Sequence, residues 1–373
     1  SIMGFPSGVP SPEAFMPFFE RTKSRGPDMS RVEKAGSGYL CFHRLAIMGL
    51  HEEGMQPFHL DGDMCVCNGE LYLFRPLKKE LEDEGYVFRS DSDCEIILPL
   101  YHKYGVEMFQ KLDAEFAMIL YDSRKNDFIA ARDPIGIRPL YYGRLPDGEW
   151  AFASEPKNLM GLCGQIRPFP PGHYWMDGQF IQYADPAYVG YFTMKTEDEV
   201  CAKLRRLLMD GVEKRLDADA PIGFLLSGGL DSSLVCAIAQ KMTDRPIRTF
   251  AIGMDTDAID LKYARTVADY IGAEHTEVYM TRQQVLDSLE EEFSPEFLVE
   301  LQAGPRIVNA SSLQEISNEV DAIFDAIIAR QQQEEQGEAH GYAASQPESL
   351  YYLLVHVASC VCHVRHCLPW TCA

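Results

Sequence analysis

Hydrophobic and polar residues alternate in short runs over the first half of the chain, and turn residues separate these runs. Alternation of this kind is typical of β-strands that bury one face. The expected strands are Gly38–Leu45, Met64–Cys67, Phe116–Asp122, Phe128–Arg132, Trp150–Ser154 and the hairpin of His173–Asp177 with Gln179–Tyr183. The helices predicted by helical spacing are Glu13–Lys23, Arg75–Glu84 and Asp93–Tyr104. We therefore expect an α+β domain with antiparallel sheets over residues 1–185.

The pattern changes after residues 186–195, which we interpret as a linker. Over residues 196–291 helix-like and strand-like segments alternate, in the order Thr196–Leu216, Ile222–Leu226, Leu234–Met242, Ile247–Gly253, Asp260–Ile271 and Glu274–Met280. Such alternation predicts a parallel sheet whose strands are connected by helices. Ligands bind such sheets at the carboxyl ends of the strands, so a functional site is expected just after Ile222–Leu226.

Residues 292–373 follow neither pattern. Apolar residues keep helical spacing between Leu313 and Ile328, and a run rich in glutamine and glutamate follows at Arg330–Glu338. We expect one amphipathic helix and a linker there. The stretch Ser359–Ala373 gathers cysteines and histidines, but their spacing matches no standard zinc finger. An unstructured tail is therefore the better interpretation of this stretch.

Composition narrows the class of protein and of partner. A chain of 373 residues exceeds what one core usually serves, so two domains are expected. The net charge of −22 and the lack of a basic run argue against a nucleic-acid partner. No apolar run approaches the ~20 residues that span a bilayer, which argues against a membrane partner. The 11 cysteines are odd in number and scattered, which favours a reducing cytoplasm over a disulfide framework.

A glycine-rich segment, Ser227–Ser233, follows the expected strand Ile222–Leu226 and precedes a helix. Adjacent glycines let main-chain N–H groups approach a phosphate, serine hydroxyls add donors, and a helix N-terminus favours an anion. Asp231 adds an oxygen ligand for Mg²⁺. The spacing is neither that of a Walker loop nor that of a dinucleotide fingerprint, and a plain strand-to-helix turn is the alternative. The segment resembles the pyrophosphate-binding loop of the ATP pyrophosphatases.

The first section carries short motifs whose order matches one known domain. Asn68-Gly69-Glu70 ends an apolar strand, and an asparagine amide beside a glycine N–H is what an oxyanion hole requires. The other motifs are Arg25–Asp28, His43–Leu45, Gln56–Pro57, Asp91–Glu95, Arg132–Tyr141 and Ala153–Lys157. Together they resemble the class II glutamine amidotransferase domain. With Ser227–Ser233 behind them, residues 1–291 resemble the glutamine-hydrolysing asparagine synthetases of the bacterial B type.

The resemblance implies a domain of the N-terminal nucleophile hydrolase type, followed by an incomplete α/β adenine-nucleotide domain. In that family an N-terminal cysteine hydrolyses glutamine, and the ammonia passes to the second domain. There ATP with Mg²⁺ activates aspartate as β-aspartyl-AMP, which ammonia converts to asparagine. Glutamine, aspartate and ATP would then be the substrates, and a homodimer is compatible with the family.

The resemblance also implies roles for single residues. Arg44 would bind the glutamine carboxylate, and Asp93 and Glu70 would bind its amino group. The expected glutamine site comprises Arg44, Leu45, Ala46, Ile47, Met48, Asn68, Gly69, Glu70 and Asp93, with Asn68 and Gly69 forming the oxyanion hole. The expected ATP site comprises Leu225, Ser227, Gly228, Gly229, Leu230, Asp231, Ser232, Ser233 and Ile252, with Asp231 near Mg²⁺. Taken singly, Arg44 also fits a surface ion pair and Asp93 a helix cap.

The sequence departs from the family in two places. The match of Ser1–Phe5 puts the catalytic cysteine immediately before Ser1, and one residue is about 3.5 Å of chain, too far for Ser1 to replace it. After Glu291 the second phosphate loop of the family is not found. Two alternatives therefore stay open: a catalytically silent pseudo-synthetase, and an adenylating ligase like the β-lactam synthetases.

Overall fold

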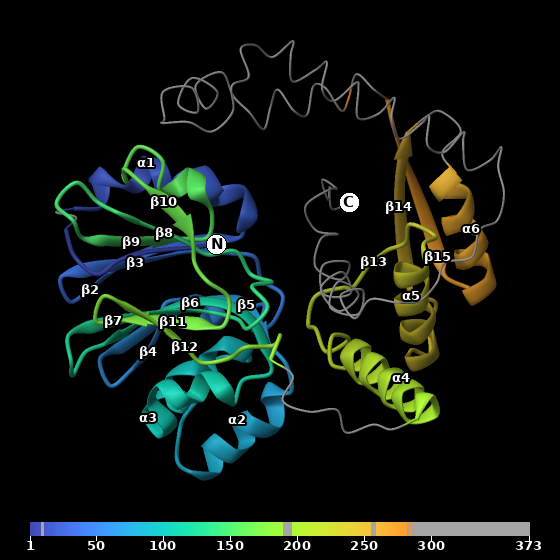
Figure 1. Cartoon of the computed structure of the whole chain (residues 1–373), viewed down its shortest axis with the longest axis horizontal. Helices are drawn as coiled ribbons and strands as arrows, with labels where there is room; N and C mark the ends of the chain where they lie inside the picture. Colours follow the sequence, from blue (N-terminus) through green and yellow to red (C-terminus); the bar gives the residue numbers. More distant parts are fainter. Residues whose placement is uncertain (9–10, 189–195, 255–258, 282–283, 285–373) are drawn as a thin grey trace.

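The computed structural model describes residues 1–8, 11–188, 196–254, 259–281 and 284 (Figure 1). The first part of the chain forms two six-stranded antiparallel sheets. The first sheet runs in the order β10 (Ile166–Pro168), β8 (Tyr141–Arg144), β9 (Trp150–Ala153), β1 (Ile2–Phe5), β3 (Gly38–Arg44) and β2 (Met29–Ala35). The second sheet runs in the order β12 (Gln179–Gln182), β11 (His173–Met176), β7 (Asp127–Arg132), β6 (Ala114–Asp122), β5 (Asp63–Leu71) and β4 (Phe58–Leu60).

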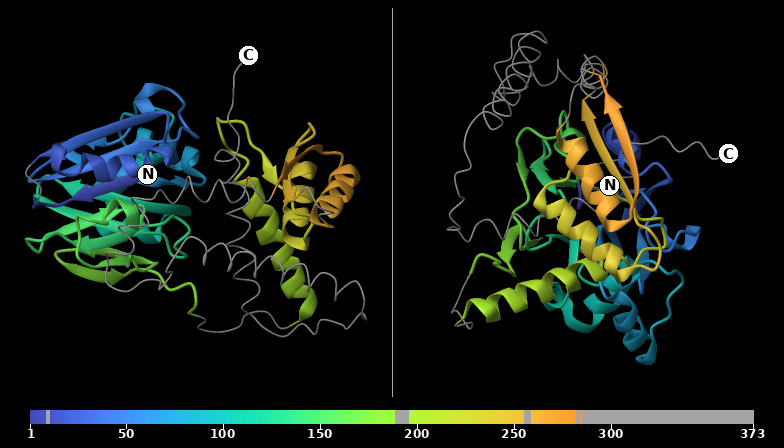
Figure 2. Two further views of the ribbon diagram at one scale, coloured as in Figure 1. Left: turned by 90° about the horizontal axis from the view of Figure 1, so that it is seen from above. Right: turned by 90° about the vertical axis from the view of Figure 1, so that its right-hand side faces the viewer.

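Helices cover the outer face of each sheet, which gives four layers in the order helix, sheet, sheet, helix (Figures 1 and 2). Outside the first sheet lies α1 (Met16–Phe19), and outside the second lie α2 (Phe74–Asp83) and α3 (Ile97–Tyr104). Short 3-10 turns complete these layers: η1 (Pro12–Ala14), η2 (Glu20–Arg25), η3 (Glu52–Gly54), η4 (Asp93–Ile96), η5 (Gly105–Gln110) and η6 (Pro156–Asn158).

Successive side chains along a strand point to opposite faces of the sheet and so enter different cores. On β1, Ile2 packs into the core between the two sheets, whereas Met3 packs on the α1 side. On β5, Val66 faces the first sheet, whereas Cys67 faces the core beneath α2 and α3. Because side chains alternate in direction along a strand, each central strand serves two cores at once. Phe152 of β9 is fully buried in the core between the sheets.

The second part of the chain alternates helix and strand: α4 (Glu197–Glu213), β13 (Phe224–Leu225), α5 (Leu230–Met242), β14 (Arg248–Met254), α6 (Ile259–Ile271) and β15 (Glu274–Met280). The strands are parallel, in the order β13-β14-β15. A capping box starts α4, in which Thr196 and Glu199 each accept a hydrogen bond from the other's main-chain N–H. The α5 helix contacts both α4 and α6, so one core serves this unit.

The expected fold class is confirmed, because antiparallel sheets with helices precede a parallel sheet. The helix expected at Glu13–Lys23 is wrong: it divides into η1, α1 and η2, and Thr22 has non-helical angles of φ −111° and ψ 18°. Five strands, β1, β2, β4, β8 and β10, were not expected. The edge strand β2 exposes most of its polar side chains, and the other four have at most four residues, too few for a clear pattern.

Several sequence expectations concern residues outside the described ones. These are the amphipathic helix between Leu313 and Ile328, the polar run Arg330–Glu338 and the cysteine–histidine stretch Ser359–Ala373. Most of the expected linker at 186–195 falls there too. All cysteines in the described part of the chain are free thiols: Cys41, Cys65, Cys67, Cys94, Cys163, Cys201 and Cys236.

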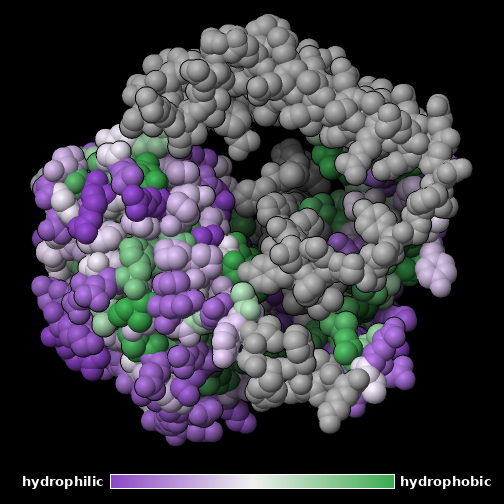
Figure 3. All heavy atoms as spheres, in the orientation of Figure 1, coloured by the Kyte–Doolittle hydropathy of each residue, from purple (hydrophilic) through white to green (hydrophobic). Residues whose placement is uncertain are grey.

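Apolar side chains are exposed mainly on the second part of the chain, where green surface is visible at the right of Figure 3. The large ones there are Leu207, Met209, Leu230, Leu234, Ile252, Tyr263, Tyr270 and Tyr279. Among the described residues, no helix combines the length and the apolar character needed to cross a membrane. The described part of this three-stranded unit thus covers its apolar surface less completely than the two-sheet domain does.

Replacing Phe152 with alanine is expected to lower the free energy of unfolding of the two-sheet domain by about 3–5 kcal/mol, because the cavity would lie in a closed aromatic core. The ring centroid of Phe152 is 5.0 Å from that of Trp175 and 6.0 Å from that of Trp150. Urea unfolding followed by tryptophan fluorescence measures the loss. Val87→Ala is the control, since Val87 is 86% exposed; an equal effect of both substitutions would contradict the assigned core.

Candidate functional site

Strand β5, next to the edge of the second sheet, carries Asn68, Gly69 and Glu70 beyond the end of its pairing with β4. The pairing with β6 sets Gly69 opposite Phe116 and Glu70 opposite Glu115. A Cβ atom on Gly69 would lie 2.5 Å from the main-chain oxygen of Glu115, so this close approach requires glycine. The Nδ2 atom of Asn68 is buried and has no hydrogen-bond partner among the described residues. Such a donor is costly to leave unpaired, so it is available to a ligand oxygen.

Three carboxyl groups gather beside this amide. Glu115 is fully buried, and its Oε1 accepts a hydrogen bond from Arg138 Nη2 at 2.7 Å. Asp93 is also buried, and its Oδ2 accepts from the N–H of Leu71 at 2.7 Å. Burial, and then repulsion from Glu115 and Asp93, raises the pKa of Glu70 to about 7. Burial also raises the pKa of Asp93. The cluster therefore favours a ligand that brings a positive charge.

Arg44 ends β3 and turns its guanidinium group into the loop that follows. It is only 3% exposed, so it is not a surface ion pair. Its Nη1 donates to the carbonyl of His51 at 2.6 Å, and its Nη2 donates to the carbonyls of Met48, at 3.3 Å, and Gly49. Burial lowers the pKa of Arg44, and the Asp28 carboxylate opposes this shift. Arginine has five N–H donors, so these bonds leave capacity for a carboxylate.

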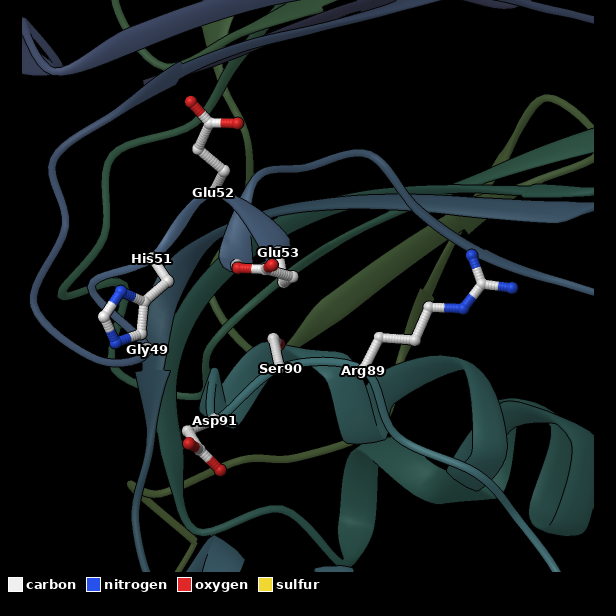
Figure 4. Close-up of a pocket in the computed structure, with 8 residues that line it drawn as sticks. Gly49, His51, Glu52, Glu53, Arg89, Ser90 and Asp91 are labelled. Carbon is white, nitrogen blue, oxygen red and sulfur yellow. The ribbon is translucent and has the colours of Figure 1, made fainter.

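The loop after Arg44 is held on both sides. The N–H of Ala46 donates to Asp28 Oδ2 at 2.8 Å, whereas Ile47 and Met48 pack into the core beneath α2 and α3. An open hollow of about 520 Å³ lies against its outer part (Figure 4). The hollow is lined by Gly49, His51, Glu52, Glu53, Gly54, Arg89, Ser90 and Asp91. None of these belongs to the expected glutamine site, which the hollow therefore adjoins without containing it.

Ser1 lies directly before β1 and hydrogen-bonds the end of β3. Its amine donates to the carbonyl of His43 at 2.8 Å, and the N–H of His43 donates back at 2.8 Å, which continues the β1–β3 ladder. Its Oγ donates to Thr22 Oγ1 at 3.0 Å. Burial, reinforced by the positive charges of Arg25 and Arg138, lowers the pKa of the amine to about 4. Both polar groups of Ser1 are thus engaged in hydrogen bonds within the fold.

The loop 227–233 connects the carboxyl end of β13 to α5. Gly228 has φ +80°, and a Cβ atom there would lie 2.5 Å from both the Ala264 nitrogen and Tyr263 Cβ. The hydroxyl oxygens of Ser227 and Ser232 are 3.0 Å apart, and the N–H of Gly229 donates to Ser227 Oγ at 3.4 Å. A further hydroxyl, that of Ser233, is buried without a partner in the described structure. The loop is therefore a cradle of donors at a helix N-terminus, which suits a phosphate group.

Other residues of the expected ATP site surround this cradle. Leu230 and Ile252 are 80% and 50% exposed, whereas Leu225 is half-buried. Apolar side chains near the carboxyl ends of the strands offer a surface to a nucleotide base. Asp231 is in the first turn of α5. Within the described residues, His, Cys, Asp and Glu side chains form no group of three or more that would hold a metal by itself.

Sequence reasoning missed partners that only the sheets bring together. Glu115 and Arg138 lie 23 positions apart in the chain but form one ion pair beside Glu70. Arg138 belongs to the motif Arg132–Tyr141, which was a signal, whereas Glu115 carried none. The same motif also shapes the main chain, because Asp133 Oδ1 accepts hydrogen bonds from the N–H groups of Ile135, Gly136 and Ile137.

Replacing Glu70 with glutamine is expected to change how stability depends on pH. Because the pKa of Glu70 rises from 4.5 to about 7 on folding, the folded chain holds a proton that the unfolded chain loses between these values. The free energy of unfolding should fall as pH rises through this window, and Glu70→Gln should remove about 3 kcal/mol of that fall. Urea unfolding at pH 4.5 and 8 measures it. The exposed Glu82→Gln is the control, and identical pH profiles would contradict the cluster.

Two neighbouring glycines should respond differently to alanine. Gly228→Ala is expected to cost about 2 kcal/mol or more and to weaken nucleotide binding, since both its φ angle and its space exclude a side chain. Gly229→Ala is the matched control for the loss of stability alone, because its φ is −69° and the nearest atom to a new Cβ would be 3.5 Å away. Thermal unfolding with and without ATP measures both, and equal tolerance would contradict the cradle.

Comparison with known proteins gives separate matches for the two-sheet part and the parallel-sheet part of the chain. The family model of the glutamine amidotransferase domain matches residues 1–173, and that of asparagine synthase matches residues 203–294. A probable glutamine-hydrolysing asparagine synthetase of Dictyostelium discoideum is 39% identical over 292 residues, which are 72% of this chain and 52% of that protein. Asparagine synthetase B of Escherichia coli (strain K12), also described as glutamine-hydrolysing, is 37% identical over 72% of this chain and 51% of that protein.

Plant relatives show similar sequence identity and coverage. Glutamine-hydrolysing asparagine synthetase 2 of Arabidopsis thaliana is 40% identical over 73% of this chain and 48% of that protein. The solved glutamine phosphoribosylpyrophosphate amidotransferase of B. subtilis is 17% identical, with a TM-score of 0.43 over 74% of this chain and 65% of that one. The chain thus spans about half the length of the curated relatives it matches. Over residues 1–294, the chain belongs to the family of the glutamine-hydrolysing asparagine synthetases.

Proposed function

We propose that the chain binds glutamine in its two-sheet domain and ATP in its parallel-sheet domain, as parts of a glutamine-dependent asparagine synthetase. The observation that carries the proposal is the pairing of β5 with β6. It sets Glu115 opposite Glu70, on the strand that also carries the unpartnered amide of Asn68. The hydrogen bond from the N–H of Leu71 holds the Asp93 carboxylate at the same end of β5. An oxyanion donor and an acidic cluster at one place match the two polar ends of a glutamine molecule.

Each polar group of glutamine is assigned to residues of complementary charge at this site. Arg44, already fixed by main-chain carbonyls, offers its remaining donors to the α-carboxylate of glutamine. Glu70 and Asp93 receive the α-ammonium group, which relieves the repulsion that raises the pKa of Glu70. Asn68 Nδ2 and the N–H of Gly69 then stabilise the oxyanion that forms when a nucleophile attacks the side-chain amide. The nucleophile that this scheme requires is a cysteine placed immediately before Ser1.

The parallel sheet holds the nucleotide. Gly228 and Gly229 let the main chain approach the phosphates, and the hydroxyls of Ser227, Ser232 and Ser233 add donors. Leu225, Leu230 and Ile252 contact the nucleoside through main-chain groups and apolar surface. Asp231 would hold Mg²⁺ through a carboxylate oxygen, and the ion would supply positive charge beside the phosphates. ATP provides the adenylyl group that activates the carboxylate of aspartate for attack by ammonia.

The wider setting follows from the same proposal. The protein works in the cytoplasm, which agrees with free thiols at every described cysteine. A net charge of −22 argues against a nucleic-acid partner. A homodimer is compatible with the proposal.

The adenylating ligase and the pseudo-synthetase differ in whether they need a glutamine pocket. An adenylating ligase that uses another amine has no need of a glutamine pocket, yet Arg44, Asn68, Glu70 and Asp93 lie here in buried, polar surroundings. A silent pseudo-synthetase would keep the pocket and lack turnover, so only an activity measurement distinguishes it.

Adding one cysteine ahead of Ser1 is expected to give a chain that releases ammonia from glutamine. Arg44→Ala in that background should lower kcat/KM by about 30-fold or more, because it removes the buried charge that pairs with the substrate carboxylate. Arg31→Ala, on the exposed edge strand β2, should have little effect. Ammonia release is measured by a coupled glutamate dehydrogenase assay. Silence of the cysteine-bearing chain would overturn the proposal in favour of the pseudo-synthetase.

A further inference from the structure

We propose that Asp219, together with the main chain of Ala220, positions the loop that completes the glutamine pocket. The inference rests on the proposed function, since it names a positioning residue for glutamine binding. It differs from the expected site, all of whose glutamine-contacting residues lie before residue 94. Asp219 belongs instead to the segment 214–220, which leads from α4 to β13 and then to the phosphate loop.

Two hydrogen bonds join this segment to the loop after Arg44. Asp219 Oδ2 accepts from the N–H of Gly49 at 2.8 Å. The N–H of Ala220 donates to the carbonyl of Ile47 at 3.1 Å. Both bonds reach main-chain atoms of 47–49, and Ala220 is only 7% exposed. The segment therefore holds the path of the loop itself.

Gly49 lies next to both residues that are expected to bind the two ends of glutamine, Arg44 and Asp93. Its carbonyl accepts from Arg44 Nη2, so the loop path sets where the guanidinium group lies. On its other side, a Cβ on Gly49 would lie 2.6 Å from the N–H nitrogen of Ser92, the residue before Asp93. Gly54 closes the remaining space, because a Cβ there would meet Arg44 Nη2 and the Gly49 carbonyl. A displacement of Gly49 therefore cannot be absorbed without moving Arg44 or the chain at Asp93.

The segment is itself anchored on the two-sheet domain. The guanidinium group of Arg75 binds the Asp217 carboxylate with contacts of 2.9–3.2 Å and lies 3.6 Å from Asp219 Oδ1. Lys214 pairs with Asp113 at 2.6 Å, and Ala218 packs against the core beneath α2 and α3. Asp219, itself an exposed residue, is the one acidic residue of 214–220 that bonds the pocket loop. Asp217 is therefore a matched control: it has the same charge and segment but no bond to 47–49.

The test uses the chain of residues 1–373 produced without any residue before Ser1, and calorimetry measures its Kd for glutamine. Asp219→Ala is expected to raise the Kd for glutamine about 10-fold, the effect of losing one hydrogen bond to a charged group. Asp219→Asn keeps an acceptor for the Gly49 N–H and should restore the Kd to within about 3-fold. Asp217→Ala should also stay within about 3-fold, and the Kd for ATP should not change in any variant.

The outcomes separate the inference from the proposed function. If the unmodified chain does not bind glutamine, the proposed function fails, and the positioning role fails with it. If that chain binds glutamine and Asp219→Ala binds it equally well, only the positioning role is overturned. An equal loss of glutamine and ATP binding would indicate general unfolding and would also overturn it. Should Asp219→Ala fold poorly, Asp219→Glu keeps the charge but shifts the acceptor by one methylene, and an unchanged Kd there would contradict the inference.

Discussion

The close approach of β5 to β6 at Gly69 is the constraint on which the proposed glutamine site depends. A side chain at this position would meet the Glu115 carbonyl at 2.5 Å, so the two strands pair only with glycine there. Their register then puts Asn68 and Glu70 on one strand beside Glu115 on the other. Gly69 therefore has a packing role that is independent of any oxyanion hole. Loss of activity on substituting it would not by itself assign a catalytic role.

The buried carboxylates around the β5–β6 pairing repel one another and so destabilise the folded chain. Arg138 compensates Glu115 directly, but Glu70 and Asp93 share a buried place with few positive neighbours. A pKa of about 7 for Glu70 means that its anion is unfavourable in the folded chain without a ligand. In the proposed complex the α-ammonium group of glutamine would remove that penalty, so part of the binding energy would come from relief of this repulsion. Functional sites commonly keep such conflicts, because the same charges that destabilise the fold recognise the ligand.

The segment 214–220 belongs to both parts of the molecule. It ends α4 and leads into the parallel sheet, while its side chains bind Asp113, Arg75 and the N–H of Gly49 in the two-sheet domain. Arg215 adds a contact, with its guanidinium carbon 4.5 Å from the ring centre of Tyr72. The glutamine loop is thus supported from the next domain, and the phosphate loop begins only seven residues after Ala220. A short covalent path and a hydrogen-bonded contact join the two proposed sites.

Local pattern by itself determined most of the longer strands, the helices α2 and α4–α6, and the strand–glycine–helix setting of Ser227–Ser233, because periodicity and turn residues are properties of neighbouring positions. It misjudged Glu13–Lys23, which divides into η1, α1 and η2 and buries Phe15 and Phe19, and it gave no sign of β1 or the edge strand β2. The resemblance to a known family, which is also carried by the sequence, named Arg44, Asn68, Glu70 and Asp93. Only the tertiary structure decided which distant groups surround them, since Glu115, Arg138 and Asp219 reach the site through sheet register and domain contact, which no local pattern encodes.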